Sequence, residues 1–403
     1  MIAPEDATAT APQPAASASQ PATTATAPHP AATANAPQFS LIDCDVHPYF
    51  AEGIRDLAEY LSPEWQHRLG LDHQPLQGAG FRAMPAAELP ANSLYVDEIA
   101  GFRRDASGEG EVPGSDPAFV ARHLLDRYGI DRAILLSGNL LGLGAMPDAD
   151  AAAAIATAYN RWMSERWLET DLRYRGALVV APQDPELAAA EIDRAGDDPG
   201  IVEILLPLSS IAMGNRHFHK IYAAAERHGL PIAVHPSGTE NVFVTGPPMP
   251  TLPTYKIEWR TALTQVHQSN LISMLSHGIF ERFPQLTLVI TEGGFAWIPD
   301  VLWRLDASWR ALRDEVPWVK RAPSEYMLER VRFTTQPFPE APRAGDAGAL
   351  CRIVDGERTL MYSSDYPHFD FDDPNRALTA LPDELRSAVF CTTALEVFGE
   401  RLL

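Results

Sequence analysis

Short runs of apolar, β-branched residues alternate with longer amphipathic stretches from residue 40 to the C-terminus, and this alternation is typical of parallel strand and helix units. Eight runs have the length and composition of strands: 40–46, 132–138, 175–181, 201–207, 231–235, 286–291, 330–335 and 359–364. Between some of them, apolar residues at spacings of three and four predict helices over 116–129, 148–170 and 295–315. The pattern therefore favours a (β/α)8 TIM barrel. A doubly wound open sheet is the alternative, but no glycine-rich phosphate turn follows the first strand.

Polar residues interrupt the first strand at every second position. In "LIDCDVHPYF" (41–50), Asp43, Asp45 and His47 alternate with apolar neighbours, so in a strand they share the face that points towards the barrel axis. Burying unpaired charge there would be strongly unfavourable. A divalent cation would offset this cost, because carboxylate oxygens and neutral imidazole nitrogens are both metal ligands.

Three other strands also end in polar residues of this kind. His235 ends the fifth run, Glu292 follows the sixth, and Asp365 follows the eighth. The carboxyl ends of barrel strands meet at one rim, where barrel enzymes bind their substrates. We therefore expect these side chains to converge with the first-strand pair. Asp43 lies deeper in the strand and is expected to bond to neighbouring backbone.

Other polar residues have a surface or structural role as an alternative to a role at the site. His368 is expected on the loop over the site, where it either contacts substrate or lies on the surface. The pair His217 and His219 has metal-like spacing but falls in a helix remote from the rim, and His277 is expected at a helix end. Arg103 could meet a substrate carboxylate or remain a solvated charge.

Two connections are longer than ordinary barrel loops. Residues 48–116 follow the first strand and residues 236–270 follow the fifth. Both leave a strand at its carboxyl end, so we expect them to form walls or a lid over the site.

Composition disfavours several classes of partner. It also separates residues 1–38 from the predicted barrel, residues 39–403. With 32 basic and 53 acidic residues the net charge is −21, which disfavours nucleic acid and anionic membranes. No run approaches the roughly 18 to 20 apolar residues of a membrane span. Three scattered cysteines indicate no disulfide framework and a cytoplasmic location. Residues 1–38, rich in Ala, Pro and Thr, are predicted to be a disordered tail.

Four motifs together carry a resemblance to a known family. "IDCDVH", "PIAVHPSG", "GIFERFPQLTLVITEGGFAWIPDVLWRLD" and "YSSDYPHFD" resemble the amidohydrolase superfamily, in its amidohydrolase-related branch typified by aminocarboxymuconate semialdehyde decarboxylase. The resemblance extends from Phe39 to the C-terminus. It implies a (β/α)8 barrel that holds one divalent metal ion, Zn or Mn.

The resemblance also implies roles for particular residues. By position, Asp45, His47 and His235 match the family's metal ligands, and Asp365 matches the aspartate that binds metal and moves protons. Asp45 stands where such enzymes commonly have His or Glu, and Glu292 stands where the prototype has a histidine. With His368 added from its place beside Asp365, the candidate catalytic residues are Asp365, Glu292 and His368. For Glu292 the alternatives are a fifth metal ligand or a carboxylate held by a neighbouring strand.

Two reactions fit this set of residues. The resemblance favours nonoxidative decarboxylation of a small aromatic or unsaturated carboxylic acid. Hydrolysis of an amide, ester or lactone by a metal-activated water is the alternative, and a barrel that binds without catalysis is a third. Trp259, Trp297 and Tyr366, expected near the mouth, suggest a flat ligand or ordinary packing. A barrel with an exposed helix layer is also compatible with a homodimer.

Overall fold

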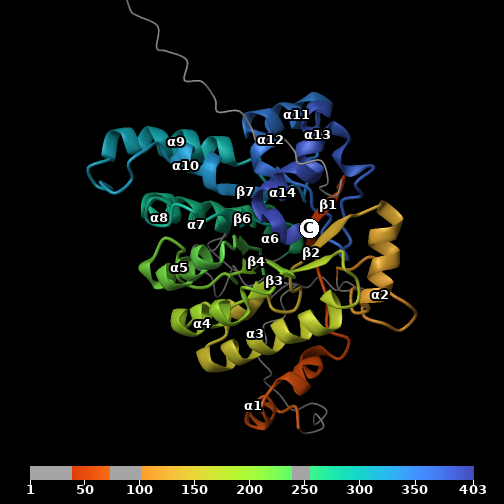
Figure 1. Ribbon diagram of the computed structural model, residues 1–403. Helices are drawn as coiled ribbons and strands as arrows, with labels where there is room; N and C mark the ends of the chain where they lie inside the picture. Colours follow the sequence, from red (N-terminus) through yellow and green to blue (C-terminus); the bar gives the residue numbers. More distant parts are fainter. Residues whose placement is uncertain (1–38, 73–100, 238–254) are drawn as a thin grey trace, which may run out of the picture. The chain divides into compact units, whose positions relative to one another are not determined.

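Eight parallel strands form the centre of the protein. The computed structural model describes residues 39–72, 101–237 and 255–403, and within them the strands pair in the order of the sequence, from β1 to β8 (Figure 1). They are β1 (Ile42–Val46), β2 (Arg132–Leu135), β3 (Tyr174–Val179), β4 (Ile201–Leu205), β5 (Ile232–Val234), β6 (Leu288–Ile290), β7 (Val331–Thr334) and β8 (Leu360–Met361). The Cys44 amide donates to the Tyr362 carbonyl at 2.9 Å, and the His47 amide donates to the Tyr366 carbonyl at 2.7 Å. These bonds join β1 to the segment of β8, so the predicted TIM barrel is confirmed.

Each of the eight apolar runs contains one strand, but the last strand is shorter than its run. Only two residues of 359–364 pair as β8. Beyond them, the Ser363 amide donates to Oγ1 of Thr335 at 3.2 Å and the Ser364 amide donates to Oδ1 of Asp43 at 2.9 Å. Side chains thus replace the backbone ladder at this end of the barrel, which shortens the strand.

Helices surround the strands in Figure 1. The α-helices are α1 (Pro63–Arg68), α2 (Pro117–Val120), α3 (Ala149–Met163), α4 (Pro185–Ala195), α5 (His219–His228), α6 (Lys256–Ala262), α7 (Thr264–Ser276), α8 (Ile279–Arg282), α9 (Ile298–Leu312), α10 (Pro323–Arg330), α11 (Ala344–Ile353), α12 (Gly356–Thr359), α13 (Asp383–Ser387) and α14 (Thr393–Phe398). Shorter 3-10 and π turns are η1 (Gly53–Tyr60), η2 (Ala121–Asp126), η3 (Leu141–Ala145), η4 (Ser164–Leu168), η5 (Arg216–Phe218), η6 (Ala377–Ala380), η7 (Ala388–Thr392) and η8 (Gly399–Leu402).

Aspartates start three of the helices that follow strands. Asp116, Asp148 and Asp184 precede α2, α3 and α4, and each carboxylate accepts a hydrogen bond from an amide of the first helical turn at 2.8–3.0 Å. Such caps satisfy amides that have no partner inside the helix. The predicted helices over 116–129, 148–170 and 295–315 are confirmed; in the first two a π turn continues the α-helix.

The two long connections are described in part, since 73–100 and 238–254 lie outside the described residues. The first contributes η1, α1 and the segment 101–116, whose Phe102 forms an antiparallel bridge with His368 after β8. The second contributes α6 and the start of α7. Both connections supply residues to the polar centre described below. The predicted tail, 1–38, also lies outside the described residues.

None of the described helices combines the length and apolar character that a bilayer crossing requires.

Candidate metal centre

Four buried side chains converge at the carboxyl ends of β1, β5 and β8. Each of Asp45, His47, His235 and Asp365 offers one ligand atom, and these atoms all lie within 4.8 Å of one another. His47 Nε2 lies 3.0 Å from Asp365 Oδ1 and 3.2 Å from Asp45 Oδ1, and His235 Nε2 lies 3.6 Å from Asp45 Oδ2. All four residues are at most 2% exposed. The predicted convergence of strand ends is therefore present.

Backbone carbonyls orient both histidine rings. His47 Nδ1 lies 3.0 Å from the Leu136 carbonyl oxygen, and His235 Nδ1 lies 2.7 Å from the Pro236 carbonyl oxygen. A carbonyl only accepts hydrogen bonds, so each Nδ1 carries the proton and donates it. In a neutral ring this leaves the Nε2 lone pair facing the carboxylates, which is the arrangement in which histidine binds a metal.

Three atoms at the centre of the cluster lack hydrogen-bond partners among the described residues. Both carboxylate oxygens of Asp45 and Nε2 of His235 are buried without a partner among the described residues. Carboxylate oxygens and imidazole lone pairs that face one another repel unless a cation or proton lies between them. Two carboxylates and two neutral imidazoles are a suitable ligand set for one divalent ion. The residues present therefore fit a metal.

The carboxylates of the centre differ in proton affinity. Burial raises the pKa of Asp45 to about 7, and burial, with the nearby Asp365 charge, raises the pKa of Glu292 to about 8. Burial also acts to raise the pKa of Asp365, but the neighbouring His368 and His47 rings hold it below its ordinary value. Without a metal, Glu292 thus retains a proton at neutral pH and Asp45 is protonated in part, and a cation held by Asp45 would displace the Asp45 proton.

Glu292 lies beside the four candidate ligands and is 8% exposed. Its Oε2 is 3.4 Å from His235 Nε2, and its Oε1 is 3.4 Å from the Arg260 guanidinium, which also forms an ion pair with Asp370. Glu292, Asp365 and Asp370 form a second group of acidic atoms within 4.8 Å of one another. Arg260 is the cation that α6 supplies to this group, so the connection after β5 contributes a side chain to it, and the wall or lid expected there stays a prediction.

The backbone is strained at the two acidic residues that follow β6 and β8. Glu292 has φ of 48° and Asp365 has φ of 60°, in the left-handed region that residues other than glycine seldom adopt. Such strain persists where the surrounding structure enforces it, and it is frequent at functional sites. Here it ends the strand alternation and turns each carboxylate to the centre.

His368 contacts the centre through Asp365. Its Nδ1 lies 2.6 Å from Asp365 Oδ1, and its Nε2 lies 2.8 Å from the hydroxyl of Tyr49. Burial disfavours the imidazolium, yet the adjacent Asp365 carboxylate raises the pKa of His368 to about 9. The prediction that His368 lies over the site is consistent with this position, whereas its contact with a substrate stays a prediction.

Asp43 has the structural role that was expected. Its Oδ1 accepts hydrogen bonds from the amides of Ser364 and Asp45 at 2.9 and 3.3 Å. It thereby links β1 to the residues after β8.

Several other predicted residues lie away from the cluster. His217 and His219 contact the Pro182 carbonyl and Arg282 respectively, and His277 ends α7. Arg103 pairs with Asp105 at 2.9 Å and lies over the Phe371 ring. These side chains are engaged in local contacts.

Tyr366, Trp297 and Trp259 were expected either to contact a flat ligand or to pack, and their contacts favour packing. Tyr366 is 1% exposed, and its hydroxyl lies 3.0 Å from His123 Nδ1. Trp297 donates to the Gly293 carbonyl at 2.9 Å, and Trp259 is 6% exposed. Phe369, at 52% exposure, is the more accessible ring beside Arg260.

The sequence patterns did not single out four residues of this region. Arg260 and Asp370 lie in connections without periodicity, so no local signal marks them. Tyr49 continues the alternation of Asp43, Asp45 and His47, and Glu203 is a lone carboxylate in the apolar β4 run. The alternation at Tyr49 and the carboxylate within the apolar β4 run were sequence signals that could have identified these two residues.

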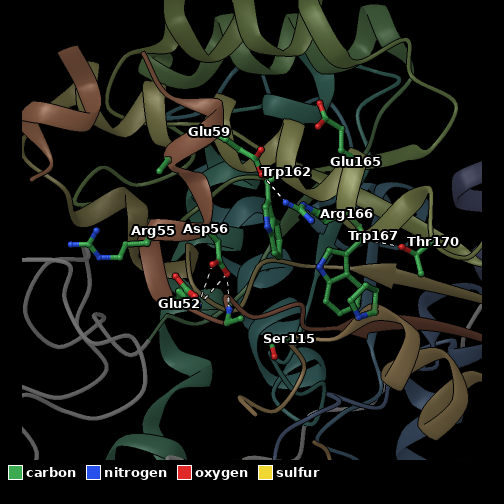
Figure 2. Close-up of a pocket in the computed structure, with 13 residues that line it drawn as sticks. Glu52, Arg55, Asp56, Glu59, Ser115, Trp162, Glu165, Arg166, Trp167 and Thr170 are labelled. Atoms are coloured by element: carbon green, nitrogen blue, oxygen red, sulfur yellow. Dashed lines mark hydrogen bonds and ion pairs between the residues drawn. The ribbon is translucent and has the colours of Figure 1, made fainter. Parts of the chain in front are cut away.

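A cavity of about 740 Å³ lies elsewhere, between the η1 region and the end of α3 with η4 (Figure 2). Trp162 and Trp167 line it, together with Glu59 and Arg166, which pair at 2.8 Å. No residue that lines it belongs to either group of candidate metal ligands. The cavity is therefore separate from the candidate centre.

Comparisons with known proteins agree with this architecture. A family model described as Amidohydrolase matches residues 42–399. Gamma-resorcylate decarboxylase of Rhodococcus jostii is 26% identical over 274 residues, which are 64% of this chain and 78% of that protein.

Solved structures show the same fold. An amidohydrolase from Mycobacterium avium subsp. paratuberculosis superposes with a TM-score of 0.65 at 19% identity, covering 90% of this chain and 99% of that one. A 5-carboxyvanillate decarboxylase from Novosphingobium aromaticivorans, complexed with manganese and 4-hydroxy-3-methoxy-5-nitrobenzoic acid, superposes with a TM-score of 0.59 at 21% identity, covering 89% and 96%.

Proposed function

The chain belongs to the amidohydrolase family, and on that premise we propose that it is a metal-dependent enzyme that decarboxylates a small aromatic carboxylic acid without an oxidant. The observation that carries this proposal is the buried group of Asp45, His47, His235 and Asp365, whose ligand atoms lie within 4.8 Å of one another. Such a group is stable at neutral pH when a cation occupies its centre. The decarboxylases among the relatives support the choice of reaction.

We assign the role of metal ligands to these four side chains. Manganese is the first candidate, because the 5-carboxyvanillate decarboxylase structure contains it, and zinc is the second, because the two imidazoles suit it. When bound, a divalent ion at such a site supplies Lewis-acid polarisation of an oxygen ligand.

Asp365 and Glu292 are the groups placed to move the proton. In the proposed reaction the bond between the ring carbon and the carboxylate breaks, carbon dioxide leaves, and the electron pair stays on the ring carbon. That carbon takes a proton from the carboxyl group of Glu292, whose raised pKa keeps it protonated, or from Asp365 after Asp365 has received the proton of His368 Nδ1 2.6 Å away. His368, with Nδ1 2.6 Å from Asp365 Oδ1, orients the Asp365 carboxylate. Arg260 forms an ion pair with Glu292 at 3.4 Å.

The proposed substrates carry a hydroxyl group next to the carboxylate. Gamma-resorcylate is 2,6-dihydroxybenzoate, the compound named in one relative, and 5-carboxyvanillate is named in another. In both compounds a carboxylate oxygen and a hydroxyl oxygen lie next to each other on a flat ring.

Turnover of these compounds by metal-loaded protein tests the proposal. The protein, reconstituted with Mn²⁺, is incubated with 2,6-dihydroxybenzoate, 5-carboxyvanillate and salicylate, and carbon dioxide release and loss of substrate absorbance are measured. Equal amounts of carbon dioxide and decarboxylated product support the proposal. If none of the three acids releases carbon dioxide, in protein shown to contain metal, the proposed substrate class is contradicted.

Hydrolysis is the second candidate, and the description of the matched family favours it. Asp365 would then take a proton from water rather than give one to carbon. A parallel panel of aryl esters, anilides and lactones distinguishes the two reactions. Hydrolysis without carbon dioxide release would replace the first proposal, and a metal-loaded protein inert in both panels would favour a binding role.

A further inference from the structure

A chain of three hydrogen-bonded side chains leads away from the candidate centre. The Tyr49 hydroxyl lies 2.8 Å from His368 Nε2, and His368 Nδ1 lies 2.6 Å from Asp365 Oδ1. The same Asp365 oxygen lies 3.0 Å from His47 Nε2. The orientation of the Asp365 carboxylate therefore depends on the His368 ring, and that ring contacts Tyr49 on its other side.

The connection after β1 holds His368 in place. Phe102 forms an antiparallel backbone bridge with His368, and their rings stack with centroids 5.8 Å apart at 20°. The Arg103 amide donates to the Pro367 carbonyl at 2.9 Å and the Phe369 amide donates to the Gly101 carbonyl at 2.8 Å. The imidazole thus has one face covered and its backbone fixed, so the partners of its two nitrogens decide its remaining freedom.

The position of the Tyr49 ring is itself tightly determined. A Cβ atom at Gly138 would lie 2.3 Å from Tyr49 Cζ, so only glycine at 138 leaves room for the ring. The Phe102 ring meets Tyr49 edge-on at 4.7 Å and 88°, and the Tyr49 amide donates to the Gly114 carbonyl at 2.9 Å. A side chain confined in this way presents its hydroxyl at a fixed point.

We propose that Tyr49 is a positioning residue that acts through His368 on Asp365. A phenol hydroxyl both donates and accepts hydrogen bonds, so it can donate to Nε2 of a neutral imidazole or accept from Nε2–H of an imidazolium. In either form the Nδ1–H of His368 points at Asp365 Oδ1. Tyr49 therefore keeps one orientation of the His368 ring and one orientation of the carboxylate. This inference rests on the proposed metal centre.

A double-mutant cycle on Tyr49 and His368 tests the inference. Y49F removes only the hydroxyl and H368Q removes the imidazole; the two single variants, the double variant and the wild type are compared. Groups that orient metal ligands typically change metal affinity or activity by about 10- to 100-fold when removed, and Tyr49 lies one residue further out. We expect Y49F to weaken Mn²⁺ binding by about 3- to 10-fold and to lower kcat by a similar factor, with KM within about twofold. Because Tyr49 acts through His368, we expect Y49F to add less than about twofold in the H368Q background.

A matched control separates positioning from general stability. Tyr222 is a buried tyrosine like Tyr49, and its hydroxyl donates to the Met213 carbonyl at 2.7 Å in a region without candidate ligands. Y222F loses one buried hydrogen bond as Y49F does, and we expect its Mn²⁺ affinity and kcat to equal those of the wild type. G138A, which displaces the Tyr49 ring, should have the effect of Y49F if it folds, as judged by circular dichroism.

The measured outcomes separate this inference from the proposed reaction. Mn²⁺ affinity, measured from the electron paramagnetic resonance signal of free Mn²⁺, needs no substrate, so the cycle can be completed even if 2,6-dihydroxybenzoate is not turned over. Effects of Y49F and H368Q that multiply in the double variant would overturn the inference, as would a Y49F variant that behaves like Y222F. Wild-type protein that binds no Mn²⁺ or Zn²⁺ would overturn both this inference and the metal centre.

Discussion

Replacing Glu203 by glutamine should make the metal-free protein more stable at high pH and leave it nearly unchanged at low pH. Glu203 lies in β4, is 1% exposed, and its Oε2 has no hydrogen-bond partner among the described residues. Burial, with a smaller contribution from the Asp45 charge, raises the pKa of Glu203 from 4.5 to about 8. The ionised form is thus disfavoured in the folded protein relative to the unfolded chain.

The sign and size of the effect follow from this pKa. A carboxyl group with a raised pKa in the folded state contributes its full stability below the unfolded pKa and loses it as pH rises through the folded pKa. The window therefore runs from about pH 4.5 to about pH 8. At about 1.4 kcal/mol per pKa unit, we expect Glu203 to lower the free energy of unfolding by roughly 3 kcal/mol between pH 5 and pH 8. Glutamine does not titrate, so E203Q lacks this loss.

Urea unfolding in the presence of EDTA measures the difference. Free energies of unfolding for the wild type and E203Q are determined at pH 5, 6, 7 and 8 from tryptophan fluorescence and circular dichroism. E191Q is the matched control, because Glu191 is also buried but its carboxylate contacts Arg194, Asn160 and Thr157. We expect E191Q to be destabilised rather than to gain stability with pH. If the free energies of unfolding of the wild type and E203Q change in parallel from pH 5 to pH 8, the raised pKa of Glu203 is refuted.

Chelation of bound metal should lower the melting temperature measured by scanning fluorimetry, and added Mn²⁺ should restore it. The reason is that a ligand at 100 times its dissociation constant stabilises the native state by about 2.7 kcal/mol. An unchanged melting temperature would argue against a buried metal site. H235A should reduce the metal content, measured by plasma mass spectrometry, to less than about a tenth of the wild-type value, since a metal site commonly fails when one ligand is lost. D365N should lower kcat by roughly 10²- to 10⁴-fold with an unchanged circular dichroism spectrum, and retention of most activity would remove Asp365 from the mechanism.

The strand pattern predicted the parts of the site that lie on strands or directly after them. Asp45 and His47 continue the two-residue alternation of β1, and His235 directly follows β5, so periodicity alone fixed the face on which each lies. The closure of the barrel then brought β1 beside the segment of β8. These residues could be placed from sequence because only the backbone period and the barrel topology are needed.

Residues on the long connections could not be placed in the same way. Arg260 reaches Glu292 and Asp370 from α6, and its position depends on how the connection after β5 folds over the rim. Phe102 reaches His368 by a backbone bridge that no local pattern indicates. Such contacts arise from tertiary packing, which overrides local preference.

Glu292 and Asp365 show where the alternation itself stops being a guide. Each has a positive φ, of 48° and 60°, so its side chain departs from the direction that the preceding strand would give it. A residue of this kind costs about 1–3 kcal/mol in backbone strain, and both bring a carboxylate into a buried region that already contains Asp45. Burying three carboxylates would add to that cost unless cations neutralise them. Arg260 is near Glu292, whereas Asp45 has no hydrogen-bond partner for either oxygen among the described residues. A cation bound between β1, β5 and β8, as proposed above, would account for both the strain and the unpartnered oxygens.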